Sequence, residues 1–196
     1  MTEARRGRPR SYDPDQALDA AIDVFWTHGY DAATLDQLSQ AMGMGRPSLY
    51  GAFGDKQALF ERAVRRFGER MATRAGRALS APRIEDAVRA VLLEVIEVYG
   101  GSGRGCLVFG VAPARAVDDP SVREMLASTI TSLDTALRAR LDRAVADGEL
   151  PAGTDTAARA RLLAATIHSL SVRARAGLPT SHLQQLAEDA VELVRR

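Results

Sequence analysis

Several residue types are scarce or missing in this chain, and each shortage excludes a class of protein. The 196 residues include one cysteine, Cys106, so no internal disulfide can form, as is usual in a reducing cytoplasm. There is no asparagine and hence no N-glycosylation acceptor. No apolar stretch approaches the roughly 18 residues that a membrane span needs. The basic N-terminus is followed by SYDPDQ rather than by the apolar segment of a signal peptide, so we expect a cytoplasmic protein.

Neither sign of charge is in excess. The 26 Lys and Arg residues against 25 Asp and Glu residues leave a formal net charge of +1. Any binding to nucleic acid must therefore come from charge that is placed locally. Aromatic residues make up only 5% of the chain, and long runs of Val, Ile or Thr are few, so the composition favours helices over sheets. We predict an all-α protein.

The motifs of common catalytic and metal sites are also missing. There is no nucleophile elbow and no metal-binding motif, and GGSGRG at residues 100–105 follows a predicted helix rather than a strand, as a phosphate loop would. The three histidines, His28, His168 and His182, are far apart and lack a ligand cluster around them. We expect no enzyme activity, no cofactor and no metal.

What the chain does have is helical periodicity with clear end signals. Asp13 and Pro14 begin a first helix that Gly29 ends, and Thr34 with Gln37 forms the capping box of a short helix. A second short helix is predicted over residues 46–53, and Asp55 caps a long one. The predicted parts of the chain are a basic arm (1–12), an N-terminal three-helix domain (13–60), a linking helix (61–80, continuing from 55), and a C-terminal helical domain (81–196).

The segment GMGRPSLYGAFG, residues 43–54, carries the strongest functional signal. Two short helices joined by a glycine-containing turn and braced by a longer helix make a helix-turn-helix. On the second short helix Leu49 and Phe53 are predicted to face the core, whereas the outward positions are small or uncharged. Small side chains allow a helix to approach the floor and walls of a DNA groove closely. Those outward positions are Pro47, Ser48, Tyr50 and Gly51. Arg46 begins the helix, where an arginine can bind guanine O6 and N7.

Other residues are predicted to contact the DNA backbone. The hydroxyl of Tyr50, the cap residue Thr34 and the single lysine of the chain, Lys56, are placed to meet phosphates. The arm contains RRGRPR, and two interpretations of it stay open. Arg8 and Arg10 either reach into a narrow minor groove or belong to a solvated tail.

The stretch TLDQLSQAMGMGRPSLYGAFGDKQALF, residues 34–60, resembles the DNA-binding motif of the TetR/AcrR family of transcriptional regulators. The match extends over residues 13 to about 65, and RGCLVFGVA is similar to a stretch found in one group of the family. The resemblance implies a homodimer with an N-terminal DNA-binding domain and a C-terminal effector domain. It also implies DNA contacts at the positions where members of the family contact DNA, which in this sequence are Thr34, Arg46, Pro47, Ser48, Tyr50, Gly51 and Lys56. Gly45 departs from the pattern, because a capping serine is frequent there.

The apolar faces of the C-terminal helices predict an effector pocket. The expected lining is Tyr99, Cys106, Phe109, Met125, Thr129 and His168. Two of these have alternative interpretations: Cys106 is a small buried hydrophobe or an oxidant sensor, and His168 is a core or interface histidine or a ligand-binding group.

The last two helices carry enough apolar surface to form a symmetric four-helix dimer contact. The predicted contact residues are Leu162, Leu163, Ile167, Leu170, Leu183, Leu186, Ala190 and Leu193. The expected function is a repressor that binds a near-palindromic operator on double-stranded DNA and is released by a small molecule. The alternatives are a redox- or electrophile-sensing regulator acting through Cys106, a small helical enzyme, and a purely architectural DNA-binding protein.

Overall fold

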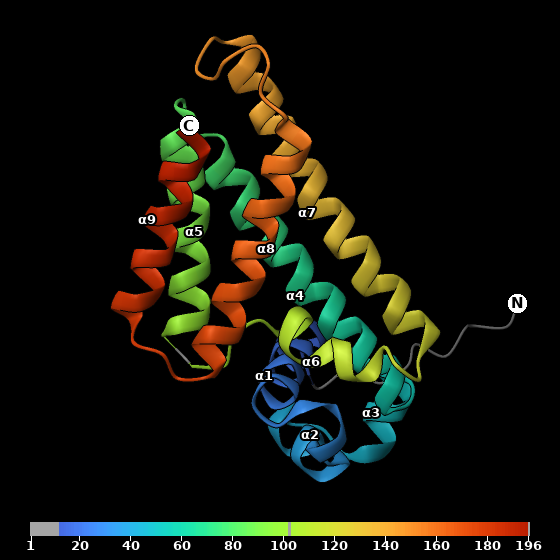
Figure 1. Cartoon of the computed structure of the whole chain (residues 1–196). Helices are drawn as coiled ribbons and strands as arrows, with labels where there is room; N and C mark the ends of the chain where they lie inside the picture. The colour runs from blue at the N-terminus through green and yellow to red at the C-terminus, as the bar shows by residue number, and fades with distance from the viewer. Residues whose placement is uncertain (1–11, 102, 196) are drawn as a thin grey trace, which may run out of the picture. The chain divides into compact units, whose positions relative to one another are not determined.

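The computed structural model describes residues 12–101 and 103–195, and all regular structure within these ranges is α-helical (Figure 1). The predicted all-α class is therefore confirmed. The helices are α1 (Pro14–Ala32), α2 (Leu35–Ala41), α3 (Arg46–Phe53), α4 (Lys56–Leu79), α5 (Ile84–Gly100), α6 (Leu107–Arg115), α7 (Pro120–Ala146), α8 (Thr156–Arg175) and α9 (Thr180–Arg195). The chain divides into two compact units, Met1–Ala63 and Val64–Arg196, with the division inside α4.

Local signals in the sequence account for where the helices begin. Asp13 accepts a hydrogen bond from the backbone N–H of Asp15 at 2.9 Å, and Asp55 accepts one from Ala58 N–H at 2.8 Å. The predicted capping box is present, because the Thr34 hydroxyl caps α2 and the Gln37 side chain returns to the Thr34 N–H. The predicted break at Gly29 is a kink with φ of 77°, after which helical structure continues to Ala32.

The core of the first unit is built around aromatic rings. Phe25 and Phe60 meet edge to face with ring centroids 5.1 Å apart, and Tyr30 lies 5.1 Å from Phe60. Leu38 of α2 and Leu49 of α3 are fully buried in the same unit. Burial of these side chains packs both short helices against the core of the unit and leaves their other faces to solvent.

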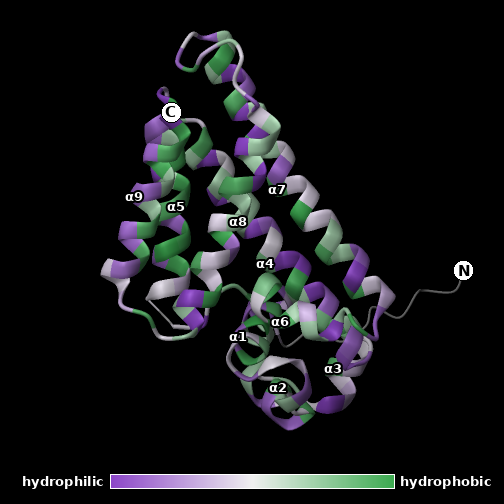
Figure 2. Cartoon of the chain, in the orientation of Figure 1, coloured by the Kyte–Doolittle hydropathy of each residue, from purple (hydrophilic) through white to green (hydrophobic). Residues whose placement is uncertain are grey.

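In the second unit α5 packs against α8 and α9, α7 packs against α8, and the short α6 lies against α7 and α8 (Figure 1). Figure 2 shows α5 as mostly hydrophobic, in keeping with its buried face of Val88, Val91, Leu92 and Val95. The central part of α7 is different. No residue of this fully described helix is buried between Val122 and Leu137, although apolar side chains recur there.

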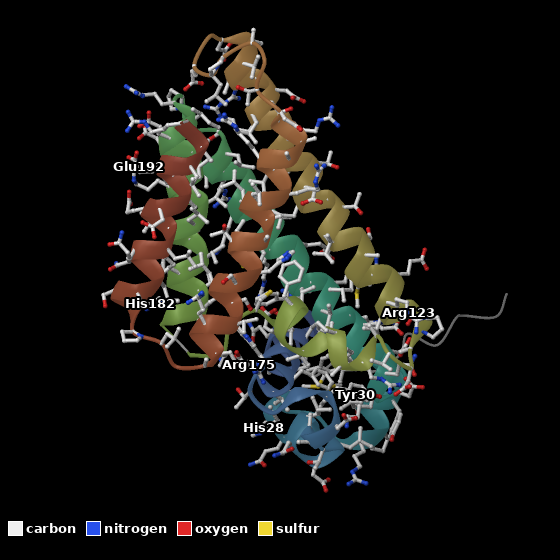
Figure 3. All side chains as sticks on the ribbon, viewed as in Figure 1. His28, Tyr30, Arg123, Arg175, His182 and Glu192 are labelled. Atoms are coloured by element: carbon white, nitrogen blue, oxygen red, sulfur yellow. The ribbon has the colours of Figure 1, made fainter. Side chains whose placement is uncertain are left out.

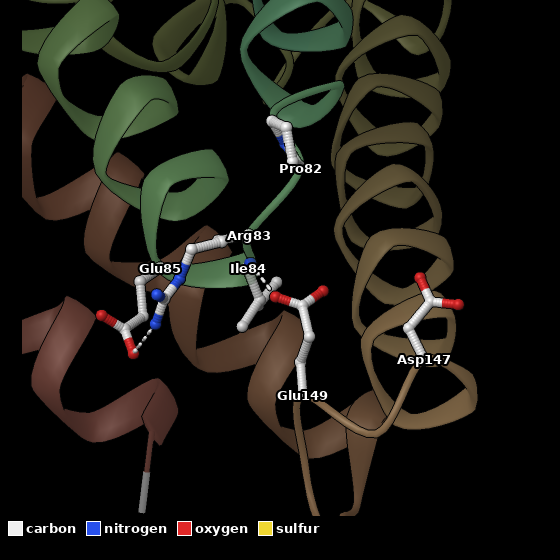
Figure 4. Close-up of a pocket in the computed structure, with 6 residues that line it drawn as sticks. All are labelled: Pro82, Arg83, Ile84, Glu85, Asp147 and Glu149. Carbon is white, nitrogen blue, oxygen red and sulfur yellow. Dashed lines mark hydrogen bonds and ion pairs between the residues drawn. The ribbon is translucent and has the colours of Figure 1, made fainter.

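A buried arginine and a half-buried glutamate hold the junction of α4 and α5, next to the predicted boundary between residues 80 and 81. Arg140, only 4% exposed, donates to the backbone carbonyls of Ala81 and Pro82 and to Glu149. The second carboxylate oxygen of Glu149 accepts the Ile84 N–H at 2.6 Å and so caps α5 beside a small hollow (Figure 4). One carboxylate therefore neutralises a buried guanidinium and satisfies a free helix N–H group.

Candidate nucleic-acid interface and effector region

Helix α3 exposes a face made almost entirely of small or uncharged side chains. Leu49 and Phe53 are 0% and 4% exposed, so they point into the core as predicted. The predicted DNA-contacting residues of this helix are all exposed, namely Arg46, Pro47, Ser48, Tyr50 and Gly51. A Cβ atom added at Gly51 would meet no atom within 4 Å, which makes this part of the face open to a partner.

The first turn of α3 has no side-chain cap. Gly45 occupies the N-cap position and makes no side-chain hydrogen bond, which is the departure from the family pattern that the sequence indicates. Backbone N–H groups at a helix start that no side chain caps favour a negatively charged group. The helix has no acidic residue in its first turn to compete for that place.

Arg46 does not project freely. Its Nε and Nη2 atoms donate to one oxygen of Asp36, at 3.0 and 2.7 Å respectively. Sequence analysis missed Asp36, since it lies on α2, ten residues before Arg46, and no helical spacing rule links two different helices.

Thr34 and Lys56 are both engaged within the first unit. The Thr34 hydroxyl donates to Gln37 Oε1 at 3.0 Å and accepts the Gln37 N–H, so a phosphate contact from it would compete with the capping box. The Lys56 ammonium lies 4.6 Å from the centroid of the Tyr30 ring and donates to the Asp31 carbonyl at 3.4 Å. These contacts fix the direction of Lys56 at the start of α4. The predicted arm residues Arg8 and Arg10 lie outside the described residues.

Two of the predicted effector residues, Tyr99 and Cys106, are hydrogen-bonded to each other and buried, at 2% and 1% exposure. Burial raises the pKa of the Cys106 thiol, which disfavours the reactive thiolate. Next to the thiol the chain runs tightly past α8: Cys106 N–H donates to the Ser171 hydroxyl at 2.7 Å, and Arg175 donates to the Arg104 carbonyl at 3.2 Å (Figure 3 labels Arg175).

Phe109 of α6 and His168 of α8 form a second pair, with ring centroids 4.1 Å apart. The Nε2 atom of His168 is buried without a hydrogen-bond partner. Burial lowers the pKa of His168, and the charge of Asp134 on α7 raises it by a smaller effect. Met125 and Thr129 are half-buried on α7, where the Thr129 hydroxyl donates to the Met125 carbonyl.

The eight residues predicted for the dimer contact fall into two groups. Five are buried within the chain itself and form core packing of α8 and α9, namely Leu163, Ile167, Leu170, Leu183 and Ala190. The others remain accessible: Leu162 and Leu193 are 68% and 67% exposed, and Leu186 is half-buried. The periodicity predicted the apolar stripes of α8 and α9 correctly, and most of the residues in them are already buried within the single chain.

Helices α8 and α9 pack against each other. Near one end of this contact, Arg159 of α8 donates to the Val194 carbonyl of α9. Near the other end, Arg173 lies 3.0 Å from the ring nitrogen Nε2 of His182 (Figure 3 labels His182). Within the described ranges no group of three or more His, Cys, Asp and Glu side chains is arranged to hold a metal ion. No helix there is long and apolar enough to cross a membrane.

Together these features define a helical DNA-binding protein whose N-terminal unit carries a helix-turn-helix. Residues 17–63 match the family model for bacterial regulatory proteins of the tetR family, and residues 80–190 match the model for tetracyclin repressor-like C-terminal domains. The chain therefore belongs to the TetR family of transcriptional regulators, as its resemblance implied.

Named relatives and a solved structure are similar to this protein over most of the chain. It is 29% identical to the transcriptional repressor ComR of Escherichia coli K12, over 96% of this chain and 91% of ComR. It is 30% identical to the regulator YezE of Bacillus subtilis 168, over 91% of this chain and 94% of YezE. A cysteine mutant of the TetR family regulator CifR, solved in complex with a 26-base-pair operator, is 34% identical with a TM-score of 0.83, over 95% of this chain and 98% of CifR.

Proposed function

We propose that this chain is a ligand-responsive repressor that binds a near-palindromic operator as a homodimer and is released by a small molecule. The observation that carries the proposal is the exposed face of α3, with Arg46 at its start and an open position at Gly51. An exposed helix surface of an ordinary globular protein would be rich in Glu, Lys and Gln. Repression is supported by the relative ComR, which is named as a transcriptional repressor.

Arg46 and Lys56 have different roles in this proposal, and operator binding separates them. Arg46→Ala should weaken specific binding by about 1–3 kcal/mol and leave non-specific binding nearly unchanged, because a base contact is lost. Lys56→Ala should weaken both alike and reduce the salt dependence, because a phosphate contact is lost. Arg138→Ala, an exposed arginine of α7, is the control. Equal loss of specific and non-specific binding in Arg46→Ala would remove its role as a base reader.

Dimerisation is supported by the accessible surface of α8 and α9. Two copies related by a twofold axis would bury Leu162 and Leu193 in a four-helix contact, and twofold symmetry requires two half-sites of opposite orientation. A variant carrying Leu162→Glu and Leu193→Glu should sediment as a monomer and bind operator more weakly. Val117→Glu changes a residue that is 69% exposed elsewhere and is the control. A monomeric wild-type chain that binds operator at full affinity would contradict this part of the proposal.

Effector binding is supported by the exposed central part of α7 and by the unsatisfied His168. Half-buried apolar side chains on α7 and an unpartnered ring nitrogen on the adjacent α8 are the kinds of group that line a mostly apolar pocket with a polar anchor. An inducer would first be found by screening. Phe109→Trp and Met125→Trp should raise the inducer concentration needed to release the protein from its operator, because the larger side chains fill the pocket. Val117→Trp should leave that concentration unchanged. If both variants fold, bind operator and respond at unchanged inducer concentration, the pocket lies elsewhere.

A further inference from the structure

The pair of Asp36 and Arg46 stands out on the α2–α3 surface. Asp36 is the only acidic residue between Thr34 and Gly54. Its side chain is 79% exposed and that of Arg46 is 54% exposed, yet one carboxylate oxygen accepts from two atoms of the guanidinium. An ion pair so exposed to water contributes little to stability. A negative charge there also repels DNA phosphates and so lowers the affinity for DNA. Asp36 is therefore unfavourable on a DNA-binding surface unless it improves DNA recognition in some other way.

The geometry of the pair indicates what that effect is. Asp36 contacts the edge of the guanidinium formed by Nε and Nη2. An arginine has five N–H donors in a planar fork, and this contact leaves both hydrogens of Nη1 and the second hydrogen of Nη2 free. Nη1 and Nη2 form the end of the fork, which can donate to guanine O6 and N7 together.

We propose that Asp36 is a positioning residue that holds the guanidinium of Arg46 in a fixed plane, with the end of its fork free for one guanine of the operator. Fixing a long side chain before the encounter reduces the conformational freedom that is lost when it binds. The same carboxylate weakens binding to all DNA through repulsion. Asp36 therefore raises discrimination between sequences at the expense of overall affinity. This inference rests on the proposed role of Arg46 as a base reader.

The test compares Asp36→Ala, Asp36→Asn, Arg46→Ala and the double variant Asp36→Ala with Arg46→Ala. The probes are an operator duplex selected from a random-sequence library, the same duplex with each G·C pair replaced in turn, and a duplex of unrelated sequence. In wild type, replacing the guanine that Arg46 reads should weaken binding about 5- to 150-fold. Arg46→Ala should abolish that difference at the one base pair.

Asp36→Ala should bind the unrelated duplex as tightly as wild type or more tightly, and lose about tenfold of the discrimination at the base pair that Arg46 reads. Asp36→Asn keeps an acceptor oxygen without the charge and should be intermediate. In the double variant the loss of Asp36 should remove no further discrimination, because its partner is gone. Asp31→Ala removes an exposed acid from the same unit and should affect all duplexes alike. Unfolding midpoints should be unchanged.

Two results would overturn the inference. If Asp36→Ala keeps the full discrimination of wild type at every base pair, Asp36 does not position Arg46. If it discriminates better than wild type, Asp36 competes with the base and must release Arg46 before binding. Failure of the proposed function gives a different result. If Arg46 does not read a base, Arg46→Ala alone would leave the discrimination between base pairs unchanged.

Discussion

Gly105, in the loop before α6, lies close to Ser171 and Arg175 of α8, and replacing it tests how tightly the loop packs against that helix. Its φ of +65° is left-handed, which costs a non-glycine residue about 1–2 kcal/mol. A Cβ atom there would also lie 2.5 Å from the backbone oxygen of Ser171, too close to be accommodated without a shift of the main chain. Such a shift would disturb the buried hydrogen bond from Cys106 N–H to Ser171, and an unsatisfied buried donor costs about 1–3 kcal/mol.

The two effects predict that Gly105→Ala lowers the free energy of unfolding by about 2–5 kcal/mol. Gly103→Ala is the matched control, because Gly103 has a similar φ of +62° but nothing within 4 Å of the added atom, so only the backbone cost applies. Unfolding followed by far-UV circular dichroism measures the loss. Trp26, the single tryptophan, lies in the first unit and reports on that unit separately by fluorescence. Equal losses in the two variants would refute the contact with Ser171 as a source of stability.

Two further predictions concern buried charge and titration. Glu149→Ala should lower the free energy of unfolding in urea by about 2–4 kcal/mol, because it leaves Arg140 buried without its carboxylate partner. Asp147→Ala, at the same hollow, should change the free energy of unfolding by less than about 0.5 kcal/mol. Burial lowers the pKa of His168 below its ordinary value of 6.5, so the unfolded chain takes up the proton first and stability should fall as the pH drops through that value. His168→Gln should flatten this dependence on pH, and an unchanged slope in that variant would contradict the prediction.

The sequence predicted the features that depend on neighbouring residues. The caps at Asp13, Thr34 and Asp55 and the break at Gly29 are each set within a few positions, and the bounds of α3 followed from the same signals. Faces of helices were also predicted correctly, as Leu49 and Phe53 show.

Features that join distant parts of the chain could not be predicted in this way. Spacing gives the apolar face of α8 but not what covers it, so it cannot show that Leu163 and Ile167 are buried within the chain itself. Cys106 and Ser171 are 65 positions apart, and their contact depends on how α6 meets α8. The pairing of Asp36 with Arg46 likewise depends on the angle between two helices, which no local pattern specifies.

The central claim is that the small, exposed face of α3 enters a DNA groove, and Gly51→Leu tests it most directly. Leucine favours a helix over glycine by about 0.5–1 kcal/mol, and the added side chain points into open space, so the variant should fold at least as stably as wild type. Gly76→Leu, at an exposed and equally open position of α4, is the control. We predict that Gly51→Leu loses operator affinity by at least about tenfold while Gly76→Leu keeps it. Operator binding by Gly51→Leu at wild-type affinity would contradict the claim.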